Sequence, residues 1–317
     1  EGWAAAFVGG HHHARGGESR LRLTKGVHLV VPHARLPVRS IVVMQARDRR
    51  SVFAVPRGAV TYLGTTDTDY GAPAAYPEIT AADADYLLEA ANRTFAGPPL
   101  VRGDVVSAWA GLRPLLHEEG KAPSEISRKD EIMTSADGML VSIAGGKLTT
   151  HRSMAERVVD QVCRHLGHQG TCRTADVPLP GGGQTPAELA VLEQTLAAGF
   201  PRLAAGAAAR LVTLYGADCV ALLARVAADP AAGEPLAGQP DVPRAEVDWT
   251  LDEEMPATLE DLLERRMRLL LFDPQQGLGG AEHAAARMAA RLGWDAARTE
   301  AELAAYRRLA ASVRTFT

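Results

Sequence analysis

Residues 140–152 read LVSIAGGKLTTHR, and this stretch indicates how part of the chain is built around a ligand. An apolar run ends in Gly145-Gly146-Lys147, and the residues that follow have the pattern of a helix. A helix N-terminus carries unpaired backbone N–H groups and a partial positive charge, and glycines let a ligand approach the backbone closely. The stretch therefore predicts a strand, a loop and a helix start that bind an anionic or electron-rich group.

The helix after this loop has a recognisable start, face and end. Thr149 or Thr150 is the expected N-cap, and Gly167 is the expected stop. The spacing predicts one apolar stripe, formed by Met154, Val158, Val162 and Leu166.

The loop does not match the phosphate-binding P-loop. That motif needs a glycine where this chain has Val141, and a serine or threonine where it has Leu148. Taken alone, these residues also allow a simpler interpretation, in which the loop is a capped strand-to-helix turn and Lys147 is solvated.

Composition narrows the class of protein. The chain has 317 residues, which is enough for two domains with their own cores. A hydrophobic content of 46% and a charged content of 23% are ordinary for a soluble globular protein. The net charge of −4 and the pI near 6.2 give no sign of nucleic-acid binding, for which a basic domain would be expected.

Cysteine usage and hydropathy indicate the cellular compartment in which the protein is found. Cys163, Cys172 and Cys219 form neither a paired framework nor a CxxC motif, which favours a reducing compartment. We find no apolar run that approaches the roughly 18 to 20 residues needed to cross a bilayer. Any membrane contact is therefore expected to be peripheral.

The first half of the chain has the pattern of a sheet. Short runs rich in β-branched residues, separated by Pro, Arg and Gly, favour an antiparallel sheet. One helix is expected at Thr80 to Phe95, with Thr80 as N-cap. Its expected apolar face consists of Ala84, Leu87, Leu88 and Ala91. The expected strands are Val27 to Val31, Ser40 to Gln45, Val52 to Val55, Thr61 to Gly64, Val105 to Ala110, Glu131 to Thr134 and Met139 to Ile143.

The second half has the pattern of a helical domain. The stretch VPLPGGGQ, from Val177 to Gln184, is the expected domain boundary, and Asp229 to Pro243 is the expected loop. The expected helices are Pro186 to Ala198, Ala204 to Tyr215, Cys219 to Ala228, Thr258 to Leu271, Gly280 to Leu292 and Thr299 to Thr315. The predicted class is α+β: a mixed, largely antiparallel sheet domain, residues 21–176, then a linker, 177–185, and an all-α domain, 186–317.

Several motifs in a fixed order carry a family resemblance. They are TKGVH at 24–28, LGTTDTD at 63–69, GLRPL at 111–115, ISRKD at 126–130 and the Gly-Gly-Lys loop. The second half adds Glu253-Glu254-Met255, TLED at 258–261 and Arg265-Arg266. Together they resemble the FAD-dependent glycerol-3-phosphate dehydrogenase family and the related glycerophosphate oxidases. The resemblance covers most of Leu21 to Ala310.

The resemblance implies an activity and a setting. Members of the family oxidise sn-glycerol 3-phosphate to dihydroxyacetone phosphate with FAD and pass electrons to a quinone. It implies a cytoplasmic enzyme on the inner face of the cytoplasmic membrane, with no nucleic-acid partner. It does not decide whether the protein forms a homodimer. Acceptor choice stays open as well, because a glycerophosphate oxidase uses oxygen instead of quinone.

One family feature is missing from the sequence. The family begins with a Rossmann-type half whose G-x-G-x-x-G turn holds the FAD pyrophosphate, and no such fingerprint follows a strand in this chain. We therefore expect the C-terminal portion of a flavoenzyme, inactive alone, with residues 1–20 as the end of the truncated FAD-binding half. The rival from another class is a non-catalytic folding or interaction module without flavin.

The resemblance implies roles for three basic residues in substrate binding. Arg113 is the expected phosphate clamp, because a guanidinium offers a planar fork that matches phosphate. Arg128 is the second clamp candidate, although it also fits a solvated position next to Glu125 and Asp130. Lys25 either supports the substrate site or is solvated.

The resemblance also implies a base and a flavin-binding loop. His28 is the candidate general base, because histidine titrates near neutral pH. The alternation of KGVHLVV equally allows a half-buried structural histidine. Lys147 is expected to stabilise the reduced flavin or the developing alkoxide. The flavin edge is expected to lie against Gly145, Gly146, Lys147, Leu148, Thr149 and Thr150.

Other polar clusters favour ordinary structure. Thr65, Thr66, Asp67 and Asp69 form either a turn or a wall of the active site. The Asp67-x-Asp69 pair fails the EF-hand pattern, and His11-His12-His13 lack a carboxylate or cysteine partner nearby, so we predict no metal site. Charged residues of the second half are expected to be ion-pair partners on helices: Glu253, Glu254, Asp261, Arg265 and Arg266.

Overall fold

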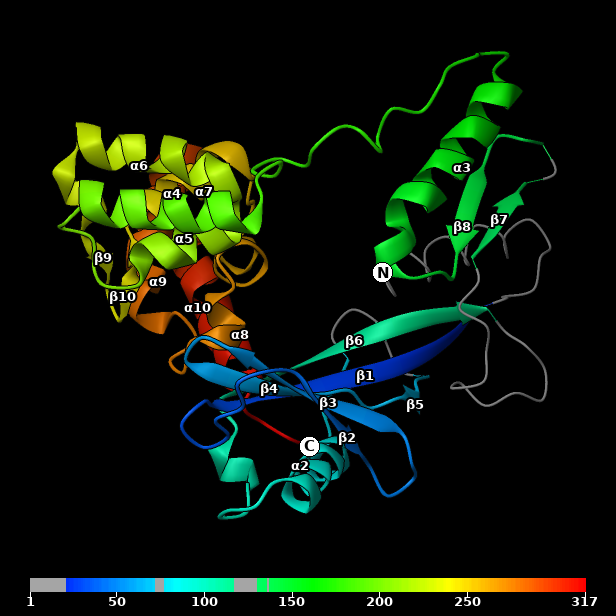
Figure 1. Ribbon diagram of the computed structural model, residues 1–317, viewed down its shortest axis with the longest axis horizontal. Helices are drawn as coiled ribbons and strands as arrows, with labels where there is room; N and C mark the ends of the chain where they lie inside the picture. The colour runs from blue at the N-terminus through cyan, green and yellow to red at the C-terminus, as the bar shows by residue number, and fades with distance from the viewer. Residues whose placement is uncertain (1–20, 72–76, 117–129, 136) are drawn as a thin grey trace. The chain divides into compact units, whose positions relative to one another are not determined.

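The computed structural model describes residues 21–71, 77–116, 130–135 and 137–317 (Figure 1). The chain divides into two compact units, Glu1–Val177 with Phe316–Thr317, and Pro178–Thr315. The last two residues belong to the first unit because Thr317 exchanges backbone hydrogen bonds with Ile79 and Ala81. The predicted fold class, a largely antiparallel sheet followed by helices, is confirmed.

The first unit is built on a six-stranded sheet with β1 (Leu21–Pro32) at its centre. Three strands pair with β1 in antiparallel register: β4, β5 and β6. β3 and β2 extend the sheet beyond β4. The bounds are β2 (Val42–Gln45), β3 (Ser51–Arg57), β4 (Val60–Gly64), β5 (Thr68–Asp69) and β6 (Ser107–Leu116).

Helix α2 (Ala81–Thr94) covers the apolar face of this sheet. Val27, Leu29 and Val31 alternate along β1 and are fully buried in the same core as Leu87 of the helix. Full burial of an aliphatic side chain of this size contributes roughly 1.5 to 3 kcal/mol. Thr80 caps the helix as predicted, in a reciprocal capping box with Asp83.

A β-bulge lies between β4 and β5, which pair with successive parts of β1. His28 and Lys25 of β1 are three positions apart, but their partners Gly64 and Thr68 are four positions apart. The partner strand therefore carries one extra residue, within the segment 65–67. The Val27 amide, which faces this segment, donates to the Thr66 hydroxyl at 2.9 Å. Bulges of this kind change the direction of the side chains they carry.

A hairpin and a helix complete the first unit. β7 (Glu131–Thr134) pairs with β8 (Val141–Ala144), and α3 (His151–His165) packs on β8 after the short 3₁₀ turn η3 (Leu148–Thr150). Thr150 is the N-cap residue of α3, although its side chain makes no capping hydrogen bond. Gly167 follows the helix with φ of 67°, as expected for a C-terminal stop.

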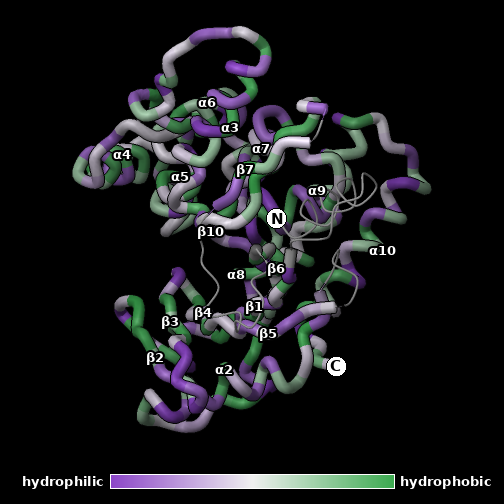
Figure 2. The backbone as a smooth tube through the Cα atoms, turned by 90° about the vertical axis from the view of Figure 1, so that its right-hand side faces the viewer, coloured by the Kyte–Doolittle hydropathy of each residue, from purple (hydrophilic) through white to green (hydrophobic). Residues whose placement is uncertain are grey.

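The second unit is helical with one small hairpin. Its helices are α4 (Pro186–Gly199), α5 (Ala207–Tyr215), α6 (Cys219–Ala228), α7 (Ala245–Glu253), α8 (Leu269–Phe272), α9 (Leu278–Leu292) and α10 (Ala296–Ser312). Hydrophobic residues recur among hydrophilic ones along α9 and α10 (Figure 2), and the buried ones form a core around Ala284, Met288 and Tyr306.

Two expectations for the second unit were wrong in detail, and one helix was missed. The segment from Asp229 to Pro243 is not a plain loop, because it forms the hairpin of β9 (Pro235–Leu236) and β10 (Gln239–Pro243). Helix α7 was not predicted. The helix expected from Thr258 to Leu271 is interrupted, since Asp261–Arg266 forms a π-helix and Arg268 has a left-handed φ of 60° before α8.

One stretch of the helical unit has the length and composition of a membrane span. Ala207–Ala228 spans 22 residues and contains an 18-residue window with a mean hydropathy of 1.6. It comprises α5, the 3₁₀ turn η4 (Gly216–Asp218) and α6, and Gly216 in this turn has a positive φ of 55°. Leu211, Leu222 and Leu223 in this stretch are fully buried in a core cluster of the helical unit. The stretch therefore contributes core residues to that unit.

A buried ion pair joins two helices of the second unit. Glu246 of α7 is fully buried and pairs with Arg210 of α5, and the Tyr215 hydroxyl donates to its other oxygen at 3.0 Å. Burial raises the pKa of Tyr215, and the nearby Glu246 carboxylate raises it further. Removing one member of such a group leaves an unpaired buried charge, so the group fixes the packing of α5 against α7.

Candidate active site

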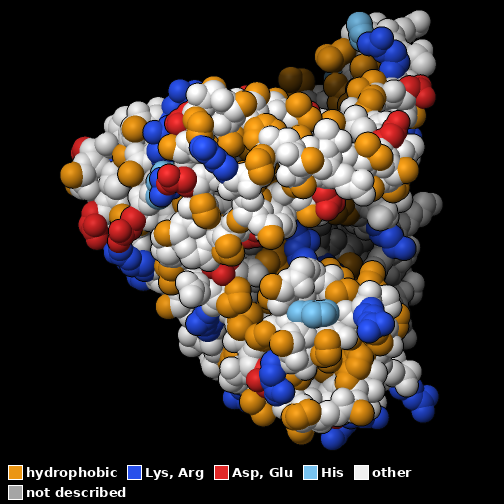
Figure 3. Space-filling view, turned by 60° about the vertical axis from the view of Figure 1, so that its left-hand side comes forward, with side chains coloured by type: hydrophobic (Ala, Val, Ile, Leu, Met, Phe, Trp, Pro, Cys, Tyr) orange, Lys and Arg blue, Asp and Glu red, His pale blue; other side chains and the backbone are white. Residues whose placement is uncertain are grey.

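The side chains singled out by the sequence lie on two different faces of the sheet. Directly opposite residues of antiparallel strands project to the same face, and residues alternate along each strand. The pairs His28 with Trp109 and Thr24 with Arg113 therefore place His28 and Arg113 on one face. This face is opposite to the one that α2 covers. Figure 3 shows one face of the molecule, on which hydrophobic side chains lie among basic and acidic ones.

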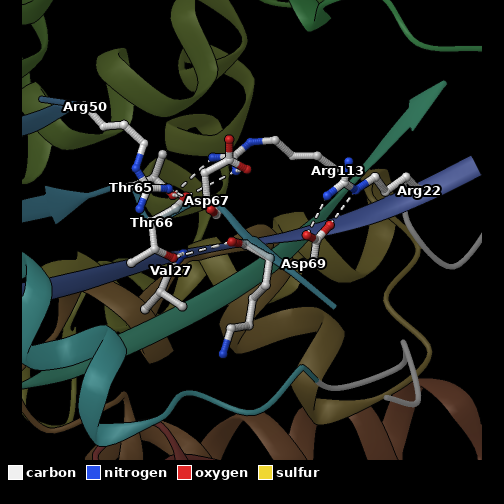
Figure 4. A network of polar contacts seen from close by, with 9 residues as sticks. Arg22, Val27, Arg50, Thr65, Thr66, Asp67, Asp69 and Arg113 are labelled. Carbon is white, nitrogen blue, oxygen red and sulfur yellow. Dashed lines mark hydrogen bonds and ion pairs between the residues drawn. The ribbon is translucent and has the colours of Figure 1, made fainter. Parts of the chain in front are cut away.

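Arg113 is held by the three residues of the β4–β5 bulge (Figure 4). Its Nη1 donates to the Thr66 carbonyl oxygen at 3.2 Å and to Asp67 Oδ1 at 3.0 Å, and its Nη2 donates to Thr65 Oγ1 at 3.1 Å. A guanidinium has five N–H donors. Within the described part of the chain, the Nε–H and one Nη2–H have no acceptor, so they are available to a ligand.

Two glycines make room for the functional side chains. A Cβ on Gly26 would lie 2.6 Å from Arg113 Nη2 and 2.7 Å from Thr65 Oγ1. A Cβ on Gly64 would lie 2.6 Å from His28 Nε2. Glycine inside a strand marks a close approach of this kind, and it was the sequence signal for both contacts.

His28 lies in an aromatic cluster. Its imidazole is stacked on Trp109, with ring centroids 4.7 Å apart and planes 7° apart, and Tyr62 meets it edge-on at 6.1 Å. Burial, and after it the positive charge of Arg113, lowers the pKa of His28 from 6.5 to about 4. The imidazole is therefore neutral at pH 7. Its Nδ1 is buried and has no hydrogen-bond partner among the described residues.

Lys25 does not lie with these residues. It precedes Gly26 on β1 and points to the opposite face, where it is 6% exposed. Its ammonium donates to Asp83 Oδ2 at 2.6 Å and to the Glu78 carbonyl oxygen at 2.8 Å. Asp83 is also the capping-box residue of α2. Lys25 thus neutralises a buried carboxylate, and the prediction that it binds substrate finds no support in this arrangement.

The Gly-Gly-Lys loop forms a separate, exposed part of the candidate site. Gly145 and Gly146 both have φ of 77°, a conformation that strongly favours glycine. Lys147 is exposed at the start of η3, and Leu148 is 77% exposed. The first N–H groups of a helix have no intrahelical acceptor, so the amides of Leu148 and Thr149 are available to an anionic ligand.

The remaining predicted residues fall outside this arrangement. Arg128, the second clamp candidate, and His11-His12-His13 lie outside the described residues. Asp69 pairs with Arg22 at 2.5 and 2.6 Å and does not share the Arg113 contacts (Figure 4). Sequence reasoning missed Trp109, although its position two residues before Gly111 on an alternating strand was the available signal.

The charged residues of the second half form the contacts of ordinary helix surfaces. Asp261 pairs with Arg265 at 2.8 Å, four residues further on. Glu253 lies 3.8 Å from Arg225, and Arg266 Nε donates to the Glu254 carbonyl oxygen at 3.1 Å. The predicted structural role of these residues agrees with these contacts.

Known families and proteins match both halves of the chain. Residues 1–152 match the family described as FAD dependent oxidoreductase, and residues 172–299 match the C-terminal domain of alpha-glycerophosphate oxidase. The aerobic glycerol-3-phosphate dehydrogenase of Bacillus subtilis (strain 168) is 40% identical over 274 residues, which is 82% of this chain and 48% of that protein. The chain belongs to the FAD-dependent glycerol-3-phosphate dehydrogenase family.

Other members of the glycerol-3-phosphate dehydrogenase family agree with this assignment. The aerobic enzyme of Staphylococcus haemolyticus (strain JCSC1435) is 38% identical over 80% of this chain and 46% of that protein. The crystal structure of the Bacillus halodurans enzyme complexed with FAD superimposes with a TM-score of 0.80 at 35% identity, over 93% of this chain and 58% of that one. The chain thus spans about half the length of the curated relatives it matches.

Proposed function

We propose that the protein containing this chain oxidises sn-glycerol 3-phosphate to dihydroxyacetone phosphate, using FAD and then a quinone. The observation that carries the proposal is the pairing of Arg113 and His28 on one face of the sheet. One side chain offers free donors to an anion, and the other offers a neutral base. The family matches support the same reaction, because the curated relatives are aerobic glycerol-3-phosphate dehydrogenases.

Arg113 is suited to bind the phosphate of the substrate. Its bulge contacts use Nη1 and part of Nη2, and this leaves the Nε–H and one Nη2–H among the described residues. Two guanidinium donors bind two phosphate oxygens in a planar fork. Arg113 is 30% exposed, so a ligand reaches it without displacing the core.

His28 is suited to accept the hydroxyl proton. A secondary alcohol that loses a hydride from carbon must also lose its hydroxyl proton, and a neutral imidazole accepts that proton. Its low pKa, caused by burial and then by the Arg113 charge, keeps the ring neutral at working pH. The stack on Trp109 fixes the plane of the ring, so that Nε2 has a defined direction.

The Gly145–Thr150 segment fits one edge of a flavin. Two glycines with positive φ remove side chains from the backbone, and the helix start supplies N–H groups and a positive end. FAD, when bound, supplies the acceptor for the substrate hydride. Lys147 and the amides of Leu148 and Thr149 would lie at the flavin edge, where their positive charge would favour the reduced ring.

Arginine substitution tests the proposal in the intact protein that contains this chain. Arg113→Ala is expected to weaken transition-state binding by about 2 to 5 kcal/mol, because a phosphate loses its charged partner. Arg113→Lys is expected to recover only part of this loss, since an ammonium lacks the planar fork. Steady-state turnover of glycerol 3-phosphate provides the measurement. Unchanged KM and kcat in Arg113→Ala would remove Arg113 from the site.

The electron acceptor requires its own experiment. The match of residues 172–299 to a domain of alpha-glycerophosphate oxidase makes oxygen the second candidate acceptor. We expect glycerol 3-phosphate to reduce a soluble quinone under anaerobic conditions at the full rate. Oxygen consumption at that same rate, without quinone, would identify an oxidase instead. The proposed peripheral membrane contact and cytoplasmic location are tested by fractionating cells that express the protein.

A further inference from the structure

We infer that Asp67, in the β4–β5 bulge, is a positioning residue that fixes the direction of the Arg113 guanidinium. This inference rests on the proposed role of Arg113 and adds to it. Asp67 acts through Arg113 and does not itself touch the substrate. The clamp is thereby already oriented before an anion arrives.

The bulge presents its acceptors to a single side chain. Thr65 offers its hydroxyl, Thr66 its carbonyl oxygen and Asp67 its carboxylate, and all three accept from Arg113. A regular strand would alternate its side chains between the two faces. The extra residue of the bulge changes this alternation, and its three consecutive residues surround one guanidinium.

Asp67 is itself fixed from the side away from Arg113. Arg50 Nη1 donates to the Asp67 carbonyl oxygen at 2.6 Å (Figure 4). Arg50 in turn pairs with Asp48 at 2.6 Å, and Asp48 accepts from the Tyr86 hydroxyl of α2 at 2.9 Å. These contacts connect the bulge to the helix on the other face of the sheet, so the Asp67 backbone does not depend on the ligand for its place.

The Asp67 carboxylate contacts one part of the Arg113 guanidinium and leaves another part available to a ligand. Asp67 and Thr66 accept from Nη1, and Thr65 accepts one hydrogen of Nη2. The donors that remain among the described residues are Nε–H and one Nη2–H, and a guanidinium binds an oxyanion through two such donors. Because the ion pair joins a charged donor to a charged acceptor, it restrains the guanidinium more strongly than a neutral hydrogen bond.

Two pairs of variants test the inference in the intact protein. Asp67→Asn retains the shape and removes the charge, and Asp69→Asn is its matched control, because Asp69 pairs with Arg22 and not with Arg113. Thr65→Val removes one acceptor, and Thr65→Ser retains it. KM, kcat and the inhibition constant of inorganic phosphate are measured, and thermal unfolding reports folding.

We expect Asp67→Asn to raise KM and the phosphate inhibition constant together by about tenfold, with a smaller effect on kcat. Thr65→Val is expected to do the same to a lesser degree, with Thr65→Ser restoring both constants. If the role of Asp67 were only structural, Asp67→Asn would lower thermal stability, and the folded fraction would keep both constants unchanged. Asp69→Asn is expected to change neither constant.

Arg113→Ala separates failure of the inference from failure of the proposed function. If Arg113→Ala raises the phosphate inhibition constant and folded Asp67→Asn does not, Asp67 has no positioning role and the clamp stands. If Arg113→Ala leaves that constant unchanged, the clamp itself is wrong, and the inference fails with it. If Asp67→Asn does not fold, the Thr65→Val and Thr65→Ser pair decides the matter by the same two constants.

Discussion

The Arg113 site and the Gly-Gly-Lys loop differ in how their functional groups are held. Arg113 is fixed by three acceptors of the bulge and lies across Gly26, and His28 is fixed by a stacked ring and lies across Gly64. Lys147 is exposed and carries its charge at the start of a short helical turn. One region is organised before a ligand arrives, and the other mainly presents backbone groups.

This difference assigns different tasks to the two regions. Charged side chains with fixed directions discriminate between ligands, because a small displacement changes their hydrogen bonds. Backbone N–H groups at a helix start favour negative charge with little demand on side-chain position. We therefore expect substitutions around the Arg113 site to act through geometry, and substitutions in the loop to act through charge.

The largest effect is expected from Gly64→Ala. The new Cβ would occupy space next to His28 Nε2 and displace the imidazole from its stack on Trp109. Loss of a positioned base reduces kcat by roughly 100-fold or more. Stopped-flow flavin reduction by glycerol 3-phosphate measures this step. The matched control is Gly103→Ala, because no atom lies near its added Cβ and its φ is not positive. Equal rates in the two variants would show that His28 is not a positioned base.

A smaller effect is expected from Lys147→Met. The charge of an exposed lysine is screened by solvent, so we expect kcat to fall by no more than about tenfold and the loss to shrink at high salt. The midpoint potential of the bound flavin should become more negative, because the reduced anion loses a nearby cation. Lys147→Arg should retain both values. A loss as large as that of Gly64→Ala would contradict the contrast between the two regions.

The smallest effect concerns pH. Protonation inactivates a base, so kcat/KM should fall as pH decreases through the folded pKa of His28, which is about 4, and not through 6.5. Burial is the main cause of this low pKa and the Arg113 charge is the second cause. Arg113→Met should therefore shift the acid limb of the kcat/KM profile to higher pH, but by less than the full difference between about 4 and 6.5. NMR titration of labelled histidine measures the pKa directly. An acid limb near pH 6.5 would show that the His28 side chain is exposed to solvent.

Much of the sheet unit was predictable because its signals are local. The alternation around Val27 and Leu29 identified the core face, and Thr80 with Asp83 marked the start of α2. The limits of α3 followed from its flanking Thr150 and Gly167. Each of these features depends on residues within a few positions of one another.

The contacts that build the site were not local. Asp67 and Arg113 are 46 positions apart, and Lys25 and Asp83 are 58 apart, so neither pair is visible before strand register is known. The sequence at 65–67 fits a turn as well as a bulge, and only the pairing with β1 decides between them. The interruption at Arg268 was missed for a related reason, since arginine has a high helix propensity and tertiary packing overrides it.

A crystal structure of the intact protein with bound glycerol 3-phosphate tests the central claim most directly. We predict that two phosphate oxygens accept from Arg113 Nε and Nη2, while Nη1 keeps its contacts with Thr66 and Asp67. The substrate hydroxyl should then face His28 Nε2. A phosphate bound elsewhere, with the remaining Arg113 donors facing solvent, would contradict the account.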